Sequence, residues 1–230
     1  RYPRFFVDEN NIKIDLTKLP EKNLQLYWES GKQQIDHIIE RQVLPAIESG
    51  EIKHLSVFAL ARIPFIIYLG NRLGDKIAID IYQKHRDGDE GWTWRKESET
   101  LQFRSNLIQG KDNDSGVALI LSLSGKIKLE ELPAYINDGF SIYEIAPEEI
   151  EPNRSLIISE DTLSVFRTIY QKLLRGIEKS HKGIKEIHLF PAIPLSVAVV
   201  CGRELLKDIT PPLHVYDKVE DEYKFTMEVK

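Results

Sequence analysis

Residues 186–218 read EIHLFPAIPLSVAVVCGRELLKDITPPLHVYDK, and this stretch decides the fold. The apolar run Ile187 to Phe190 predicts a buried strand. Pro194 suits the first turn of a helix, where its missing N–H costs nothing, and we expect that helix to run from Leu195 to Lys207. Leu213 to Tyr216 predicts a second strand. Together they form a β–loop–α–β unit, whose two strands are parallel and whose crossover is right-handed.

In such a unit, the loop after the first strand and the residues after the second strand emerge at one edge of the sheet. Ligands bind open α/β sheets at that edge. The residues at the strand ends are therefore the first candidates for function.

The overall composition is that of a water-soluble globular protein, with 42% hydrophobic and 29% charged residues among 230. The net charge of −5 argues against a general binder of nucleic-acid backbones, but it does not exclude a small anionic ligand. No apolar run approaches the roughly 20 residues of a membrane span, so no membrane partner is expected. The single Cys201 excludes an internal disulfide and fits a reducing compartment, which predicts a cytoplasmic protein.

Apolar periodicity predicts alternating strands and helices along the rest of the chain, which is typical of the α/β class. A long helix is expected over Glu21 to Ser49, where Pro45 should bend or end it. The other expected strands are 55–59, 77–82, 117–123 and 141–145, and the other helices are 65–73, 129–136 and 161–180.

The opening unit has a counterpart earlier in the chain. Phe58-Ala59-Leu60-Ala61-Arg62-Ile63-Pro64 matches Phe190-Pro191-Ala192-Ile193-Pro194, with a turn two residues longer in the first copy. Residues 79–84 (IDIYQK) likewise match residues 213–218 (LHVYDK). The same residue types in the same order favour duplication over chance similarity of two ordinary units. Two such halves, packed about a pseudo-twofold axis, would form a composite pocket for a ligand built of repeated units.

These segments resemble a known family, the SAVED domain. IHLFPAIPLSVAVVCGR, LHVYDK and EYKFTMEV are similar to its C-terminal half, and FALARIPFIIYLGNRL and IAIDIYQK to its N-terminal half; VALILSLSG and SIYEIAP fit between them. The resemblance implies two fused CARF-like, Rossmann-like modules. It also implies a sensor of cyclic oligonucleotides in bacterial anti-phage (CBASS-type) defence, whose binding drives oligomerisation and activates a fused effector such as a DNA endonuclease.

The resemblance also implies a domain plan. Residues 1–20 would be an arm or linker from an N-terminal effector outside this chain, 21–150 the first half and 151–230 the second. The expected ligand is a cyclic di-, tri- or tetranucleotide, with no cofactor, and other nucleic acid would be contacted only through the effector. An alternative is a phosphodiesterase, a ring nuclease that degrades the cyclic nucleotide, and a third reading is a scaffold that only mediates assembly.

Candidate ligand residues of the first half lie at its strand ends. Arg62 would pair with a phosphate, although it could be a solvated surface arginine. Tyr82 and Lys84 form a Tyr-x-Lys pattern that could stack a base and neutralise a phosphate. Trp92 and Trp94 could close over a base, or could be alternate residues on one face of a β-hairpin.

Tyr216 and Lys218 of the second half repeat the Tyr-x-Lys pattern. Ser122, Ser124 and Lys126 follow the most apolar strand, which lies in the first half, and an ordinary turn is the alternative there. Small side chains in the two turns would let a phosphate approach the backbone, and a serine hydroxyl could donate there. These turn residues are Pro64, Phe190, Pro191, Ala192, Pro194 and Ser196.

The sequence contains none of the motifs of common enzymes. Gly-x-Ser-x-Gly, P-loop and Gly-x-Gly-x-x-Gly patterns are absent, and the six histidines show no metal-ligand spacing. Neither a catalytic residue nor a metal ligand is therefore predicted, and this chain is expected to be a regulatory domain.

Overall fold

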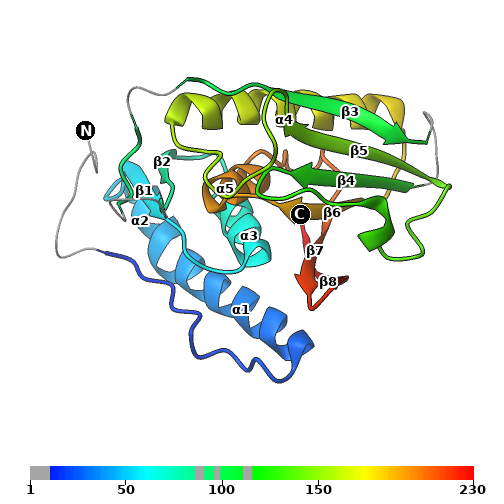
Figure 1. The fold of residues 1–230 in the computed structure, drawn as a ribbon. Helices are drawn as coiled ribbons and strands as arrows, with labels where there is room; N and C mark the ends of the chain where they lie inside the picture. Colours follow the sequence, from blue (N-terminus) through cyan, green and yellow to red (C-terminus); the bar gives the residue numbers. More distant parts are fainter. Residues whose placement is uncertain (1–10, 86–90, 96–98, 111–115) are drawn as a thin grey trace.

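The computed structural model describes residues 11–85, 91–95, 99–110 and 116–230 (Figure 1). Residues 1–10 of the expected N-terminal arm lie outside this range, and residues 11–20 form no helix or strand. The elements are α1 (Leu24–Ile38), the π-helix η1 (Ile39–Val43), α2 (Leu44–Glu48), β1 (His54–Phe58), α3 (Ile63–Leu73), β2 (Ala78–Tyr82), β3 (Phe103–Gln109), β4 (Gly116–Ser122), the 3-10 helix η2 (Leu129–Glu131), β5 (Phe140–Pro147), α4 (Glu160–Ser180), β6 (Ile187–Ala192), α5 (Leu195–Arg203), β7 (Leu213–Val219) and β8 (Glu222–Val229).

The strands form two sheets, which confirms the α/β class. β1 and β2 pair in parallel as a two-stranded sheet, and a six-stranded sheet has the order β3-β5-β4-β6-β7-β8. β6 and β7 are parallel, as the opening unit predicts, while β3 and β8 are antiparallel edge strands. Because β3, β4 and β5 join the sheet of β6 to β8, the expected boundary near residue 150 does not separate two sheets.

The most apolar strand is buried on both faces. Leu119 and Leu121 of β4 point into the core with α4 and α5, whereas Ala118 and Ile120 point into a second cluster. That second cluster is covered by the segment after β4, including Ile127. A strand buried on both faces has an unbroken apolar sequence, which explains residues 117–121.

Helices α3 and α5 cross in the middle of the molecule, between the two-stranded and the six-stranded sheet (Figure 1). A Cβ atom on Gly70 would lie 2.2 Å from the Val199 carbonyl oxygen, and one on Gly202 would lie 1.8 Å from that of Ile67. Each glycine thus faces the residue three positions before the glycine of the other helix. This reciprocity is what a pseudo-twofold axis through the crossing requires.

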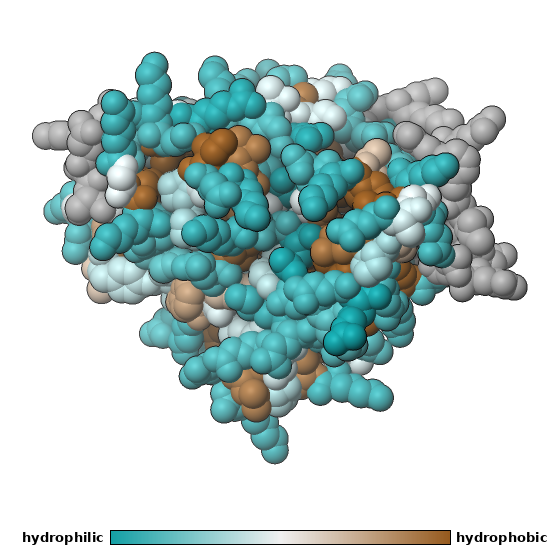
Figure 2. Space-filling view, turned by 180° about the vertical axis from the view of Figure 1, so that it is seen from behind, coloured by the Kyte–Doolittle hydropathy of each residue, from teal (hydrophilic) through white to brown (hydrophobic). Residues whose placement is uncertain are grey.

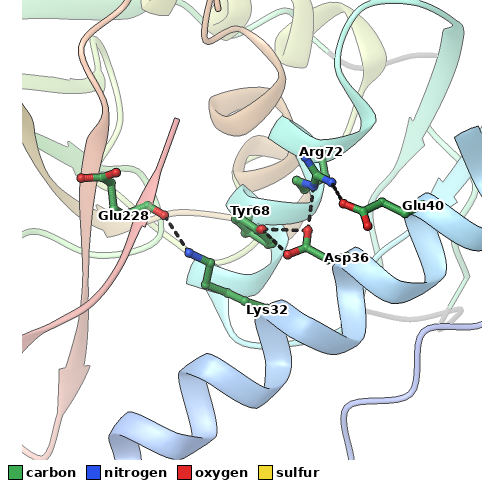
Figure 3. A network of polar contacts seen from close by, with 6 residues as sticks. All are labelled: Lys32, Asp36, Glu40, Tyr68, Arg72 and Glu228. Atoms are coloured by element: carbon green, nitrogen blue, oxygen red, sulfur yellow. Dashed lines mark hydrogen bonds and ion pairs between the residues drawn. The ribbon is translucent and has the colours of Figure 1, made fainter.

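Helix α1 packs outside this crossing and contacts both α3 and β8 (Figure 3). Asp36 accepts a hydrogen bond from the Tyr68 hydroxyl at 2.8 Å and pairs with Arg72 at 2.7 Å, both on α3. Lys32 donates to the backbone carbonyl of Glu228 on β8 at 3.4 Å. One helix therefore bridges the first repeat and the edge of the large sheet.

Three expected elements differ from the structure. The helix expected over 129–136 is only the short η2, and residues 91–95 form no strand, so the hairpin reading of Trp92 and Trp94 is wrong. α5 ends at Arg203 rather than Lys207, and its C-cap residue Glu204 pairs with Arg167 of α4 at 2.5 Å.

The surface seen from behind is mainly hydrophilic, with separate hydrophobic patches (Figure 2). Among the described residues, no helix combines the length and apolarity needed to cross a membrane.

Candidate functional site

The two repeats are joined by an ion pair at the start of α3. Arg62, the N-cap residue of α3, contacts Asp217 near the end of β7 with a nitrogen–oxygen distance of 2.8 Å. Its guanidinium also lies 4.9 Å above the ring centre of Trp28. Burial raises the pKa of the Asp217 carboxyl, and the Arg62 charge opposes that rise. Arg62 is therefore a partly covered, paired residue rather than a solvated one.

A matching contact occurs at the start of α5. The side-chain oxygen of Gln83, directly after β2, accepts hydrogen bonds from the Ser196 backbone N–H at 3.0 Å and from its hydroxyl at 2.8 Å. Gln83 thereby satisfies an N–H group that the first turn of a helix leaves open. Gln83 and Asp217 hold equivalent positions in the two copies, so each repeat reaches across to the helix start of the other.

The end of the first repeat carries a cluster of aromatic rings and a cation. Phe58 stacks on Tyr82 with ring centres 4.6 Å apart and an angle of 3° between the rings. Trp92 packs edge-on against Phe58 at 5.3 Å. The ammonium of Lys84 lies 5.9 Å from the centre of the Trp92 ring.

The end of the second repeat carries the same arrangement. Phe190 stacks on Tyr216 at 4.5 Å, and Tyr223 packs edge-on against Phe190 at 5.4 Å. The Lys218 ammonium lies 6.0 Å from the centre of the Tyr223 ring. Tyr223 comes from β8, whereas Trp92 comes from the segment after β2. The two rings nevertheless take the same position within their clusters.

The two aromatic clusters differ in exposure. Phe58 is 39% exposed, whereas Phe190 is fully buried and Tyr216 is 2% exposed. The Tyr216 hydroxyl bonds His188 Nδ1 at 2.8 Å and also contacts the Tyr135 hydroxyl. Burial raises the pKa of Tyr216 far above its ordinary value, so the phenol stays protonated. Of the two clusters, the first is therefore the more accessible from solvent.

The residues after β4 form a tight turn against the second repeat. The Ser122 hydroxyl is buried and donates to Glu144 at 2.7 Å. The backbone N–H of Ser124 donates to the Ala192 carbonyl at 2.7 Å, and Lys126 is exposed beyond it. Ser122 therefore shapes the turn, while Ser124 and Lys126 remain within reach of solvent.

The turn of the second repeat is shorter than expected. Phe190, Pro191 and Ala192 all belong to β6, so only Ile193 and Pro194 connect it to α5. A proline is tolerated in this strand because β6 pairs with β7 only as far as Leu189, and no partner on that side needs the missing N–H.

The predicted site residues therefore divide by burial. Trp94 is partly buried and donates from its ring nitrogen to the Ile81 carbonyl at 3.1 Å. Those within reach of solvent are Arg62, Lys84, Trp92, Trp94, Ser124, Lys126, Ala192 and Lys218. Those that are buried are Pro64, Tyr82, Ser122, Phe190, Pro191, Pro194, Ser196 and Tyr216.

Sequence reasoning missed four residues that organise this edge. Phe58, Gln83 and Asp217 lie inside the aligned repeat segments, so the signal for them was their matching position. Tyr223 lies outside the repeat and carries no such signal, because its equivalence to Trp92 exists only in space.

Two pockets flank the crossing. One of about 190 Å³ lies beside the first turn, lined by Phe58, Ala61 and apolar residues of α1 and α3. Another, of about 290 Å³, lies between β2, α4 and the end of α5, with Arg167 and Arg203 on its wall. The first adjoins the exposed aromatic cluster, and the second lies at the opposite end of α5.

The histidines also differ from expectation. Glu186, His188 and His214 bring possible metal-ligand atoms within 4.8 Å of one another, although their spacing along the chain gives no such signal. Glu186 and His188 lie two residues apart at the start of β6, and the sheet register brings His214 of β7 beside them.

The structure is similar to solved Cap4 SAVED/CARF-domain containing receptors. It matches the Acinetobacter baumannii Cap4 SAVED/CARF-domain containing receptor with the cyclic trinucleotide 3'3'3'-cAAA at a TM-score of 0.64 and 16% identity, covering 96% of this chain and 48% of that chain. The same receptor with 2'3'3'-cAAA gives 0.63 and 15%, covering 91% and 45%. The Moraxella osloensis Cap4 receptor gives 0.58 and 14%, covering 95% and 45%.

The chain spans just under half the length of these receptors, and at this identity the likeness shows the fold alone. No curated protein matches the sequence. The family model for the SMODS-associated and fused to various effectors sensor domain, however, matches residues 35–229. With that match over most of its length and two repeats tied reciprocally at their helix starts, the chain belongs to the SAVED family of sensor domains.

Proposed function

We propose that this chain binds a cyclic oligonucleotide in the crevice between its two repeats, as the sensor of an anti-phage effector. The observation that carries the proposal is the reciprocal pair of contacts, Arg62 with Asp217 and Gln83 with Ser196. A ligand that inserts beside these contacts would meet both helix starts and the first aromatic cluster. A ring of repeated nucleotides offers similar groups to two similar walls.

The first aromatic cluster is the proposed base platform. Phe58 is 39% exposed, Trp92 stands edge-on to it, and Lys84 supplies a cation beside Trp92. Stacking a base on an aromatic ring contributes about 1–3 kcal/mol, and a nearby ammonium suits a bridging phosphate. Arg62 would contribute by exchanging part of its pairing with Asp217 for a phosphate oxygen.

The remaining predicted residues are proposed as the rest of the wall. Ser124, Lys126 and Lys218 are within reach of solvent and would contact phosphate or ribose. The buried residues would act by shaping the turns. The first ligands to test are cyclic trinucleotides, because two of the similar receptors were solved with 2'3'3'-cAAA and 3'3'3'-cAAA.

Calorimetric titration with a panel of cyclic di-, tri- and tetranucleotides tests this proposal. At least one ligand should bind more tightly than tens of micromolar, a threshold of about −6 kcal/mol. Phe58→Ala should weaken that ligand by about 5- to 150-fold, the equivalent of one lost stacking contact. Leu107→Ala, which removes an exposed apolar side chain on the edge strand β3, is the control and should leave affinity unchanged. No binding across the whole panel would overturn the proposal.

The same titrations separate a sensor from a ring nuclease. The bound ligand should be recovered intact after long incubation, since the proposed edge holds cations and aromatic rings for binding. Recovery of linear fragments would make the phosphodiesterase the better reading. We further propose that the protein works in the cytoplasm, fused to an N-terminal effector such as a DNA endonuclease.

A further inference from the structure

Four possible metal ligands lie on one face of the large sheet, at the edge opposite the proposed nucleotide site. Glu186 precedes β6, and His188 is the second residue of that strand. His188 is the register partner of His214 on β7, and His214 is the register partner of Glu228 on β8. Register partners share a face, and so do residues two apart on a strand, so all four side chains stand together.

Their ligand atoms are already close. His188 Nε2 lies 3.8 Å from a Glu186 carboxylate oxygen, and His214 Nε2 lies 3.4 Å from one of Glu228. The ligand atoms of Glu186, His188 and His214 all lie within 4.8 Å of one another. Tetrahedral zinc with bonds of about 2.0–2.1 Å needs neighbouring ligand atoms at about 3.3 Å. Side-chain rotations would bridge that difference for these three, while Glu228 lies outside their 4.8 Å group and would join it from its position beside His214.

The surroundings fix the imidazole rings as metal sites usually do. His188 Nδ1 bonds the Tyr216 hydroxyl at 2.8 Å, which leaves Nε2 directed at the carboxylates. An oxygen on the second ring nitrogen of a ligand histidine is the common arrangement around metals. The ring of Phe225 packs 5.1 Å from His214. Glu228 is anchored through its backbone carbonyl by Lys32, while its side chain points away from that contact (Figure 3).

We propose that Glu186, His188, His214 and Glu228 form a structural site for a divalent metal ion, with Zn²⁺ as its occupant. Two neutral imidazoles and two carboxylates carry a charge of −2, which one divalent cation balances. Mixed nitrogen and oxygen donors suit zinc, whereas Mg²⁺ and Ca²⁺ prefer oxygen alone. Four protein ligands close the site, so the ion would clamp β6, β7 and β8 rather than activate water.

The competing interpretation is a pair of ordinary His–Glu ion pairs with no preference for metal. The two interpretations differ in how the ligands respond to an added ion. A site binds one equivalent with a defined geometry, whereas ion pairs give only weak binding at scattered surface histidines.

The test uses the metal-stripped 230-residue chain without a histidine tag. Zinc affinity is measured by competition with a chromophoric chelator, and Co²⁺ is added separately as a spectroscopic probe. One equivalent of Zn²⁺ should bind, and Co²⁺ should give the intense visible bands of tetrahedral coordination. His214→Gln and Glu228→Gln should each weaken zinc binding by about tenfold or more, because even outer partners of metal sites cost 10–100-fold.

Two matched variants control for scattered binding. His54→Gln removes a histidine that pairs with Asp80 on the small sheet at 3.2 Å, and His37→Gln removes an exposed one on α1. Both should keep full zinc affinity. Equal affinity in the wild-type chain and in folded His214→Gln, or an octahedral Co²⁺ spectrum, would overturn the proposal. Neither outcome bears on nucleotide binding, which concerns the opposite edge.

Discussion

At the scale of single residues, the contact between Arg62 and Asp217 joins the turn before α3 to the end of β7. Asp217 has a side chain only 18% exposed, so it needs its cation, while Arg62 is 37% exposed and faces the proposed ligand. A residue that already holds one anion can take part in binding another by sharing its donors. Arg62 therefore contributes to the fold of the ligand-free chain and is also the residue that we propose contacts a phosphate.

Arg62→Glu should destabilise the ligand-free chain, because it places a second carboxylate against Asp217. The expected loss is about 1–3 kcal/mol, between the values for exposed and for buried pairs. Thermal and urea unfolding measure it, with Lys126→Glu at an exposed position as the control. The exchanged variant Arg62→Glu/Asp217→Arg should regain most of the stability. An unchanged melting temperature in Arg62→Glu would show that the pair contributes nothing to the fold.

Stability should also depend on pH through Asp217. Burial raises the pKa of Asp217 above the ordinary 3.8, so the folded chain holds this proton to a higher pH than the unfolded chain does. The contribution of Asp217 to the free energy of unfolding therefore falls as the pH rises from its unfolded pKa through its folded pKa. The Arg62 charge limits this loss of stability. Arg62→Ala should raise the pKa of Asp217 further. The gap in melting temperature between wild type and Arg62→Ala should therefore widen from about pH 4 to pH 7. A constant gap would contradict this assignment.

At the scale of elements, the crossing of α3 and α5 depends on two glycines. A side chain on Gly70 or Gly202 would collide with backbone of the facing helix, and backbone cannot rotate away as a side chain can. The close approach is what lets each helix start reach the strand end of the other repeat. Gln83 and Ser196 complete that reach at the start of α5.

Gly202→Ala should destabilise the protein by about 1–3 kcal/mol, the usual cost of overpacking, although alanine favours helix by about 1 kcal/mol. Gly70→Ala should act in the same direction. Gly176→Ala on α4 is the matched control, since a Cβ there meets nothing within 4 Å, and it should stabilise slightly. Chemical unfolding measures all three. If Gly202→Ala stabilised the chain as Gly176→Ala does, the helices would not be held in close contact.

Gln83→Ala should cost about 1–2 kcal/mol, the size of a lost helix N-cap, because Ser196 loses its acceptor. Gln25→Ala on the exposed side of α1 is the control, since within the described part of the chain Gln25 bonds only its helix neighbour Glu29, at 2.9 Å. Unfolding free energies compare the two. Similar small effects in both would mean that water replaces the Gln83 contact.

At the scale of the whole molecule, the two repeats have the same local geometry but different surroundings. The first holds a two-stranded sheet and an exposed Phe58, and the second is built into six strands and buries Phe190. Two unlike outer faces can join head to tail, and such contacts continue into rings or filaments. A ligand promotes this only by binding the assembling conformation more tightly than the other.

The saturating ligand should therefore raise the mass of the protein. Sedimentation velocity with and without ligand measures this, and Phe58→Ala at the same ligand concentration should stay closer to its original mass. A tightly bound ligand that leaves the full-length protein at its starting mass would refute assembly as the switch. An internal conformational change within one chain would then take its place.

The sequence alone determined the elements whose apolar pattern is continuous and locally punctuated. Residues 187–190 and 117–121 could be recognised as strands because burial on both faces leaves unbroken apolar runs, and α4 because its stripe repeats at helical spacing. The repeat was visible because matching residues occur in the same order along the chain in both copies. It placed Arg62 and Lys84 after the ends of β1 and β2, where the structure has them.

Tertiary structure decided what depends on distant contacts. The pairing of Arg62 with Asp217, the burial of Tyr216 and the equivalence of Tyr223 with Trp92 each join segments that no local pattern connects. The grouping of His188, His214 and Glu228 arises from sheet register, which sequence spacing does not encode. Periodicity reports which face of an element is buried, but only packing determines which residues of other elements lie against it.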